Sequence, residues 1–170
     1  MIRVVGSSLL AAGAALLGVC AVWHMNKRVC DLYQLILGLE SMARELDYRL
    51  APLPELLKLA EAATQTRVSM FFGLCAKGAE HLNGRTFQSV WQQAIEAGQL
   101  RLEPSDIAVL EQLGGVLGRY DAENQLQSLR ETVAQIKAQY GEAGEERRRL
   151  GRVYSVLGIT AGAFVMILLV

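Results

Sequence analysis

The sequence predicts an all-α protein, a six-helix antiparallel bundle flanked by an N-terminal and a C-terminal transmembrane helix. Three observations predict this class. Both ends of the 170-residue chain are almost free of charge, the middle repeats apolar residues at steps of three and four, and proline, glycine and capping residues divide that middle into helical segments. Of the 17 basic and 17 acidic side chains, all but Arg3 lie between His24 and Arg152. No segment shows a convincing period of two, which a half-buried strand would require.

The two ends are the expected membrane spans. Residues 4–23 form a stretch of 20 without a charge, and residues 153–170 form a second of 18. As helices they would extend about 30 and 27 Å, which matches a hydrocarbon core of about 30 Å. We therefore expect a transmembrane helix in 1–23, a helical domain in 24–152 and a transmembrane helix in 153–170. Gly158 and Gly162 form a GxxxG pair that favours close helix packing, although glycine is common in membrane helices.

Basic residues beside the spans predict the orientation of the chain. Lys27 and Arg28 follow the first span, and Arg147, Arg148 and Arg149 come shortly before the second. By the positive-inside rule, the middle domain then lies in the cytoplasm. The expected location is the cell membrane, crossed twice.

A cleaved secretory signal is the alternative interpretation of the first span. Leu17-Gly18-Val19-Cys20 loosely resembles a lipoprotein cleavage site. Against this, the apolar stretch exceeds the usual signal core of about 7–15 residues, and Val19 stands where a small residue is expected. Whether the span is cleaved or lipidated at Cys20 stays open.

The middle domain begins with a helix followed by a proline-rich corner. The apolar residues predicted to face inward on this helix are Val29, Leu32, Ile36, Leu39, Ala43, Leu46 and Leu50. Pro52 and Pro54 end it and open a short second helix, because proline is tolerated in a first turn but not in a helix interior. Leu56, Leu57 and Leu59 supply the apolar residues of this second helix.

Three further helices follow, each with its own boundary residues. A helix over 66–82 is expected to end at the Asn83-Gly84 turn, and Thr86 to cap the next helix, which Gly98 ends. The segment Glu103-Pro104-Ser105-Asp106 predicts a helix start, since proline and acidic groups favour the N-terminal end, and this helix extends to Gly118.

The last helix is expected to begin near Asp121. Its apolar residues form a heptad-like seam of Leu126, Leu129, Val133, Ile136, Tyr140 and Ala143. The spacing allows the helix to continue through the arginines into the second span, although Gly141 and Gly144 weaken that interpretation.

The sequence offers little catalytic chemistry, and we expect no enzyme activity, cofactor or metal. No phosphate loop, dinucleotide fingerprint or nucleophile elbow is present. The histidines and cysteines lack metal-ligand or dithiol spacing; they are His24, His81, Cys20, Cys30 and Cys75. Carboxylates are mostly interleaved with basic residues, as on a solvated face. A net charge of zero removes the electrostatic case for nucleic acid.

Taken in order, these features resemble the stage III sporulation protein AB family over essentially the full chain. The basic exit after the first span is followed by a helix carrying Leu35, Ile36, Leu39, Glu40 and Glu45. After it come the Leu50-Ala51-Pro52-Leu53-Pro54-Glu55 turn, the pairs Leu113-Gly114 and Leu117-Gly118, then Asp121 and Gln125, and a basic helix that leads into the last span. Each motif is weak alone, but their order and the chain length make the joint match specific.

The resemblance implies a structural role rather than catalysis. Family members belong to an envelope-spanning complex that the mother cell builds around the forespore, and their cytoplasmic domain is similar to platform protein F of type II secretion. The expected partners are a cytoplasmic ATPase, stage III sporulation protein AA, other stage III sporulation membrane proteins and membrane lipid. Polar and turn residues beside apolar helix faces suggest a partner surface that includes the Leu50–Glu55 turn and the Asp121–Arg130 start of the last helix. The residues singled out for it are Leu53, Glu55, Gly118, Asp121 and Gln125.

The sequence leaves two alternatives to the platform role open. A membrane-anchored signalling adaptor would dimerise through the seam of residues 126–143, whereas a platform protein would present a compact bundle. A membrane enzyme is a third and more distant option. Homo-oligomerisation, ring symmetry and transported cargo are left open by the sequence.

Overall fold

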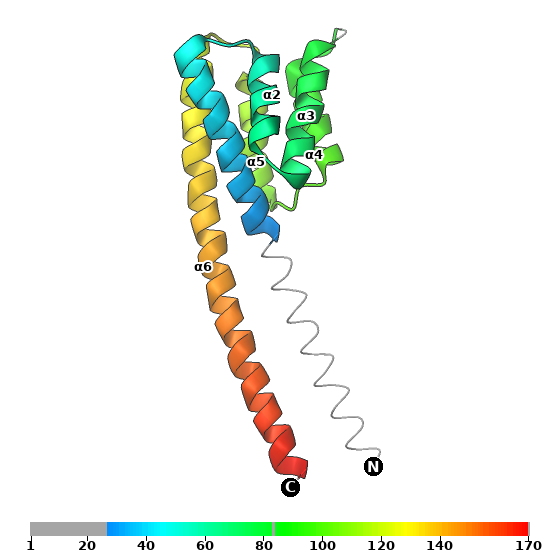
Figure 1. Cartoon of the computed structure of the whole chain (residues 1–170), viewed down its shortest axis with the longest axis vertical. Coiled ribbons are helices and arrows are strands. Elements are labelled where there is room, and N and C mark those ends of the chain that lie inside the picture. Colours follow the sequence, from blue (N-terminus) through cyan, green and yellow to red (C-terminus); the bar gives the residue numbers. More distant parts are fainter. Residues whose placement is uncertain (1–26, 83, 170) are drawn as a thin grey trace. The chain divides into compact units, whose positions relative to one another are not determined.

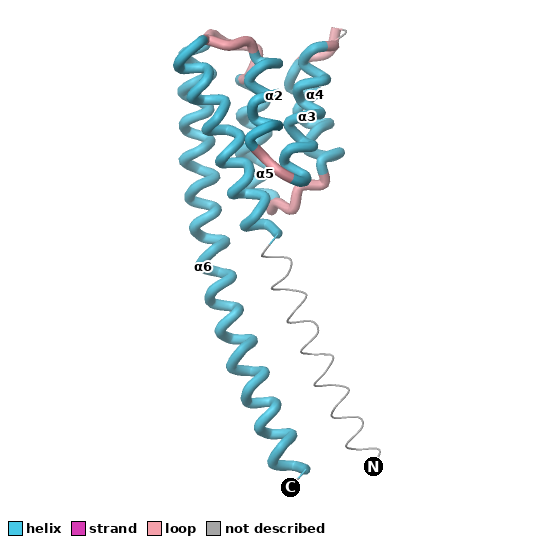
Figure 2. Tube along the Cα trace, viewed as in Figure 1, coloured by secondary structure: helices cyan, strands magenta, loops and turns pink. Residues whose placement is uncertain are grey.

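The computed structural model describes residues 27–82 and 84–169, and within them the chain is all-α (Figures 1 and 2). There are six helices and no strand in this described part, as predicted. The first helix covers residues 27–49. It is followed by α2 (Leu53–Ala63), α3 (Thr66–Glu80), α4 (Phe87–Gly98), α5 (Pro104–Val116) and α6 (Ala122–Leu169).

The helix starts use the capping chemistry that the sequence indicated. Pro52 precedes α2 in an extended conformation, and a second proline occupies the first turn. The Thr86 side chain accepts a hydrogen bond from the Ser89 N–H at 3.3 Å, which satisfies one of the free donors at the start of α4. Glu103 and Asp106 form a capping box around Pro104 at the start of α5.

Helix α4 ends at Gly98, as predicted. The residue after it, Gln99, adopts the left-handed conformation, with φ +49°. Gly98 is buried, and a Cβ placed there would lie 3.3 Å from the Phe71 Cβ. A larger residue at this position would require Phe71 to move by a few tenths of an ångström, and Gln99 adopts the strained conformation.

Residues Arg28–Gly141 form one compact unit. Within it α2 packs on α3, α3 on α4, and α4 on α5. Its largest fully buried side chain is Trp91. The centroids of the Trp91 and Phe71 rings are 4.8 Å apart, and the Trp91 indole N–H donates a hydrogen bond to the Leu110 carbonyl at 2.8 Å. Gly114 lies directly against the Trp91 indole, since a Cβ there would lie 2.3 Å from the ring. This glycine therefore serves close helix packing.

The first helix and the start of α6 lie side by side and antiparallel (Figure 1). Arg130 Nη2 is 2.9 Å from Asp47 Oδ2, and Lys137 Nζ is 2.7 Å from Glu40 Oε1. The second pair lies seven residues forward on α6 and seven back on the first helix. This is the register of an antiparallel heptad pair, and it buries the predicted seam residues Leu129, Val133 and Ile136.

Two leucines expected in the core are exposed. Leu50 falls one residue after the first helix ends and is 69% exposed, because its left-handed backbone turns the chain away from the helix axis. Leu59 is also exposed, because α2 buries the face that carries Leu56, Leu57 and Ala60.

Helix α6 continues without interruption through Gly141, Gly144 and the arginines to Leu169. In the part of the chain that the structure describes, no helix is both long and apolar enough to cross a membrane. The predicted first span lies outside the described residues. The surroundings of Gly158 and Gly162 also lie outside them, so their predicted packing stays a prediction.

Candidate partner-binding surface

The predicted partner residues meet where α5 turns into α6. Gly118 has φ +74°, a left-handed conformation that glycine adopts without steric cost, and it makes the tight bend that the sequence allowed. A Cβ at Gly118 would lie 3.1 Å from Leu53 Cδ2, so the start of α2 packs onto this bend. The Gln125 amide closes it from the other side, since Oε1 accepts from the Gly118 N–H at 3.2 Å and Nε2 donates to the Tyr120 carbonyl at 2.5 Å.

Asp121 caps α6 on the same bend. Its Oδ1 accepts hydrogen bonds from the Asn124 N–H at 3.2 Å and the Asn124 side-chain amide at 2.6 Å. Four of the five predicted residues, Leu53, Gly118, Asp121 and Gln125, therefore lie together, and their polar groups are used within the chain. Glu55 is exposed in the first turn of α2. We call residues 48–55 and 118–125 the corner.

The corner also exposes three apolar side chains, of which only Leu50 falls within the predicted partner segments. Tyr48 is 83% exposed, Leu50 69% and Tyr120 52%. Leu50 has φ +51°, a conformation that costs a residue with a Cβ about 1–2 kcal/mol. All three residues lie at or just beyond a helix end, next to the residues that form the turns, and this position was the signal available in the sequence.

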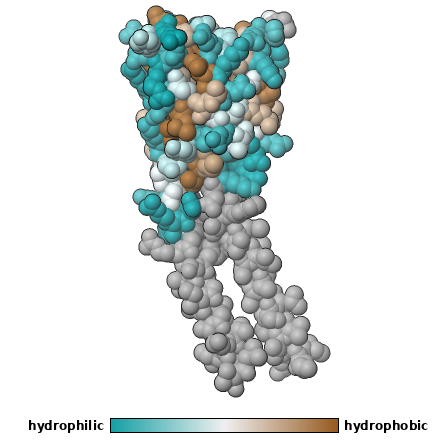
Figure 3. Space-filling model, in the orientation of Figure 1, coloured by the Kyte–Doolittle hydropathy of each residue, from teal (hydrophilic) through white to brown (hydrophobic). Residues whose placement is uncertain are grey.

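Below the corner, a groove runs between the first helix and α6. It consists of two adjoining hollows of about 700 and 360 Å³, which share the Asp47–Arg130 ion pair. The smaller hollow is lined by Ala43 and Val133, and the larger by Leu50 and Leu126. Figure 3 shows apolar patches interleaved with hydrophilic residues on one face of the bundle. The corner thus continues into a partly apolar groove with charged rims.

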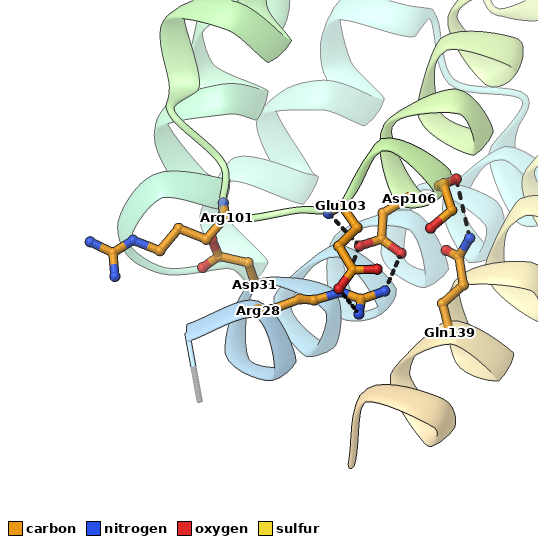
Figure 4. A network of polar contacts seen from close by, with 7 residues as sticks. Arg28, Asp31, Arg101, Glu103, Asp106 and Gln139 are labelled. Atoms are coloured by element: carbon orange, nitrogen blue, oxygen red, sulfur yellow. Dashed lines mark hydrogen bonds and ion pairs between the residues drawn. The ribbon is translucent and has the colours of Figure 1, made fainter. Parts of the chain in front are cut away.

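The other end of the first helix holds a buried charge cluster (Figure 4). Arg28 makes two hydrogen bonds to the Asp106 carboxylate, Nε to Oδ2 at 2.9 Å and Nη2 to Oδ1 at 3.0 Å. Its Nη1 lies 2.6 Å from Glu103 Oε1. Asp106 is fully buried and also accepts from the Glu103 N–H at 2.9 Å, so one carboxylate caps α5 and pairs with the first helix.

Two neighbours extend this cluster, which we call the base network. Asp31 is buried and accepts from the Arg101 N–H at 2.9 Å, and Gln139 of α6 donates to the Ser105 carbonyl at 3.2 Å. In the sequence, Arg28 indicates the membrane orientation of the chain and Asp106 indicates a helix start. Their pairing across 78 residues could not be read from local patterns.

The remaining candidate groups are structural. Burial raises the pKa of the Cys75 thiol, which lies in the core as a small packing group, whereas Cys30 is exposed. Over the residues described, no cluster of histidine, cysteine and carboxylate side chains has the arrangement of a metal site. On the surface, a hydrogen bond to Lys58 lowers the pKa of Glu80, and the same bond raises the pKa of Lys58.

The fold and the corner together define an all-α domain with exposed apolar side chains beside a bend that internal hydrogen bonds hold in shape. The chain belongs to the stage III sporulation protein AB family, whose model matches residues 3–170. A solved structure described as stage III sporulation protein AB is 22% identical, with a TM-score of 0.65 over 72% of this chain and 98% of that one, which shows a shared fold. A comparison with curated proteins gives no match. Family membership assigns the chain a role in sporulation.

Proposed function

We propose that this protein is a non-enzymatic membrane platform component of the secretion-like channel between mother cell and forespore. In this proposal it docks a cytoplasmic ATPase, stage III sporulation protein AA, through the corner. The support is family membership, together with a surface that is apolar, exposed and held in shape by its own hydrogen bonds. Other stage III sporulation membrane proteins are further partners, and no nucleic acid is involved.

The proposed location is the mother-cell membrane around the forespore, crossed twice. The charge-free stretches 4–23 and 153–170 support two anchors, and the flanking basic residues favour a cytoplasmic bundle over 24–152. A partner bound at the corner would then be joined to a membrane anchor by one continuous helix, since α6 starts beside the corner and ends at Leu169. Homo-oligomerisation is compatible with this arrangement.

The observation that carries the proposal is Leu50. An apolar side chain exposed to water is unfavourable compared with a buried one, and its left-handed backbone adds a further cost. Within the described residues, the Leu50 side chain lines the groove but stays 69% exposed, so most of its apolar surface gains no burial in return. Backbone strain at an exposed apolar residue is typical of a functional surface, because a partner that covers the side chain offsets the cost.

The flanking tyrosines suit the same purpose. Tyrosine buries a large aromatic area with few rotatable bonds, and it is enriched among residues that dominate interface energetics. Tyr48 lies on the same chain segment of the corner as Leu50, and Tyr120 lies on the other segment. We therefore expect the partner to cover all three side chains, while the Gln125 and Asp121 hydrogen bonds preserve the shape of the surface.

The test is capture of the purified ATPase by the full chain. Leu50→Asn keeps the left-handed backbone accessible but removes the apolar group, and we expect at least a tenfold loss of affinity, on the order of one lost hot-spot contact. The double variant Tyr48→Ser, Tyr120→Ser should lose as much or more. Glu55→Lys combined with Asp121→Asn reverses the first charge and removes the second while asparagine still caps α6, and should weaken capture.

Matched controls separate recognition from folding. Gln99→Gly relieves a left-handed residue away from the corner, and Met70→Ser removes an exposed apolar side chain of α3. Both should bind like the unmodified chain. Unchanged affinity of the Leu50 variant and of the double tyrosine variant would refute docking at the corner.

The adaptor alternative has a specific structural cost. Leu129, Val133 and Ile136 are already buried within one chain, so a parallel dimer through this seam would have to withdraw them from the bundle. Sedimentation of the full chain in detergent measures its oligomeric state and distinguishes the adaptor model from the platform model, since the platform model does not need a dimer joined along α6. A crosslink between Ala134→Cys residues of two copies would support the adaptor instead.

A further inference from the structure

Helix α6 carries an ordered sequence of charges along its axis. Glu142, Glu145 and Glu146 come first, and Arg147, Arg148 and Arg149 follow directly. After Arg152, no charged residue occurs up to the end of the helix. Acidic, basic and apolar segments thus succeed one another along a single continuous helix.

The three consecutive arginines form a partial ring around the helix rather than a single face. Successive residues of an α-helix are rotated by about 100° and advance by about 1.5 Å, so three in a row span about 200° around the axis within about 3 Å of length. All three are exposed. A protein partner would dock on one side of the helix and reach only part of such a ring.

These arginines are also not neutralised by their own helix. Glu145 stands four residues before Arg149, the spacing at which a glutamate and a basic residue pair best. Among the residues described, however, the structure gives none of the three arginines an ion pair. The guanidinium groups are therefore available to an external anion.

We propose that Arg147, Arg148 and Arg149 bind the phosphate groups of anionic phospholipids at the bilayer surface. A leaflet offers phosphates on every side of a helix that enters it, which matches a ring of cations, whereas one free phosphate ion could not reach all three. Guanidinium groups bind phosphate through paired N–H donors. The inference rests on the proposed membrane anchor at residues 153–170 and adds a lipid preference to it.

The test uses the full chain in vesicles of phosphatidylcholine mixed with an equal amount of phosphatidylglycerol. Spin-labelled versions of each lipid report its relative association with the protein. Because one basic side chain near an anionic surface contributes the equivalent of about a fivefold preference, we expect about fivefold enrichment of phosphatidylglycerol at the unmodified chain. The triple variant Arg147→Gln, Arg148→Gln, Arg149→Gln should bring this ratio close to one.

Two control variants and a competitor sharpen the result. The triple replacement of the same arginines by lysine keeps the charge and should retain most of the preference. Arg49→Gln, Lys77→Gln, Arg85→Gln removes the same charge from exposed sites of the bundle and should leave it unchanged. Excess glycerophosphoglycerol or inorganic phosphate should not abolish the preference; if it does, the site binds a soluble anion and the proposal is wrong.

The failures of the two proposals are distinguishable. Extraction of the vesicles at alkaline pH reports whether the chain is integrated in the bilayer. An integrated chain without a phosphatidylglycerol preference overturns the lipid inference alone. A chain that alkali extracts overturns the membrane anchors of the proposed function and this inference with them.

Discussion

The two ends of the first helix differ in the chemistry and in the burial of their side chains. At the base, Arg28 and Asp106 are charged and nearly enclosed, and each has its hydrogen-bond partners within the bundle. At the corner, about 33 Å further along the helix, Leu50 and Tyr48 are apolar and exposed. Buried charge with complete pairing holds elements in register, whereas exposed apolar area is available to a partner.

This difference separates the residues that stabilise the fold from those that are available to bind a partner. Losing one partner of a buried ion pair leaves an uncompensated charge, so substitutions in the base network should act on folding. Substitutions of the exposed corner side chains should act on binding and leave folding intact or improve it. The following variants test that separation, beginning with the largest expected effect.

Asp106→Ala should destabilise the bundle by about 3 kcal/mol, at the lower end for a broken buried pair because Glu103 still contacts Arg28. The variant also removes the acceptor for the Glu103 N–H. Urea unfolding of the full chain in detergent measures the change. The companion Arg28→Met, Asp106→Leu replaces both charges and should be less destabilised than the single variant; equal stability of Asp106→Ala and the unmodified chain would show that the base network does not hold the bundle.

Gly118→Ala should cost about 1–2 kcal/mol, because φ +74° is unfavourable for a residue with a Cβ. The added methyl group would also meet Leu53 at 3.1 Å, so the corner must shift by a few tenths of an ångström. This is the one corner position at which folding and ATPase binding should fall together. Gly141→Ala, in open space on α6, is the matched control and should be neutral or slightly stabilising. A stable variant with intact binding would mean that the bend does not shape the surface.

Leu50→Asn should stabilise the bundle by about 0.5–1 kcal/mol, since asparagine tolerates the left-handed backbone better than leucine does. The urea midpoint should rise while ATPase affinity falls, an opposition that loss of structure cannot produce. Gln99→Gly should give a similar rise with unchanged affinity. A destabilised Leu50→Asn chain would place this leucine among the structural residues.

Glu80→Gln should produce the smallest effect, confined to a change in pH dependence. The Glu80 pKa is lowered from 4.5, so its pair with Lys58 stabilises the fold above that pH and the stabilisation is lost as pH falls through the lowered value. The Lys58 pKa is raised from 10.5, so the same contribution is lost as pH rises through the raised value. The difference between the thermal unfolding temperatures at neutral and at acid pH should be slightly smaller in the variant. Lys58→Gln should behave alike, and a dependence unchanged in both variants would show that the pair contributes nothing.

Much of the fold could be read from local residue patterns. The helix starts at Pro52, Thr86 and Pro104 follow from capping and backbone geometry, which depend on a few consecutive residues. The seam of α6 was visible because a heptad repeat places its apolar residues on one side of the helix. Leu50 and Gln99 escaped the same reasoning, since only the path of the chain after a helix decides which residue takes the left-handed conformation.

The candidate surface was predicted in part. Gly118, Asp121 and Gln125 stand out in sequence as turn and capping residues, and the structure brings three such residues together with Leu53. The side chains of Asp121 and Gln125 hold the shape of the corner through hydrogen bonds within the chain. Leu50 lay within a predicted partner segment but was also expected on the inward face of the first helix. Tyr48 and Tyr120 were not predicted, because no local pattern near a turn shows which side chains stay exposed.

By itself the sequence determined the helical class, the order of the helices and the family, because periodicity, caps and motif order are properties of the linear chain. Only the tertiary structure decided which charges are buried and which apolar side chains are exposed. Arg28 pairs with Asp106, and Glu40 with Lys137, across long stretches of chain. Burial depends on all elements that pack around a residue at once, and no local pattern contains that information.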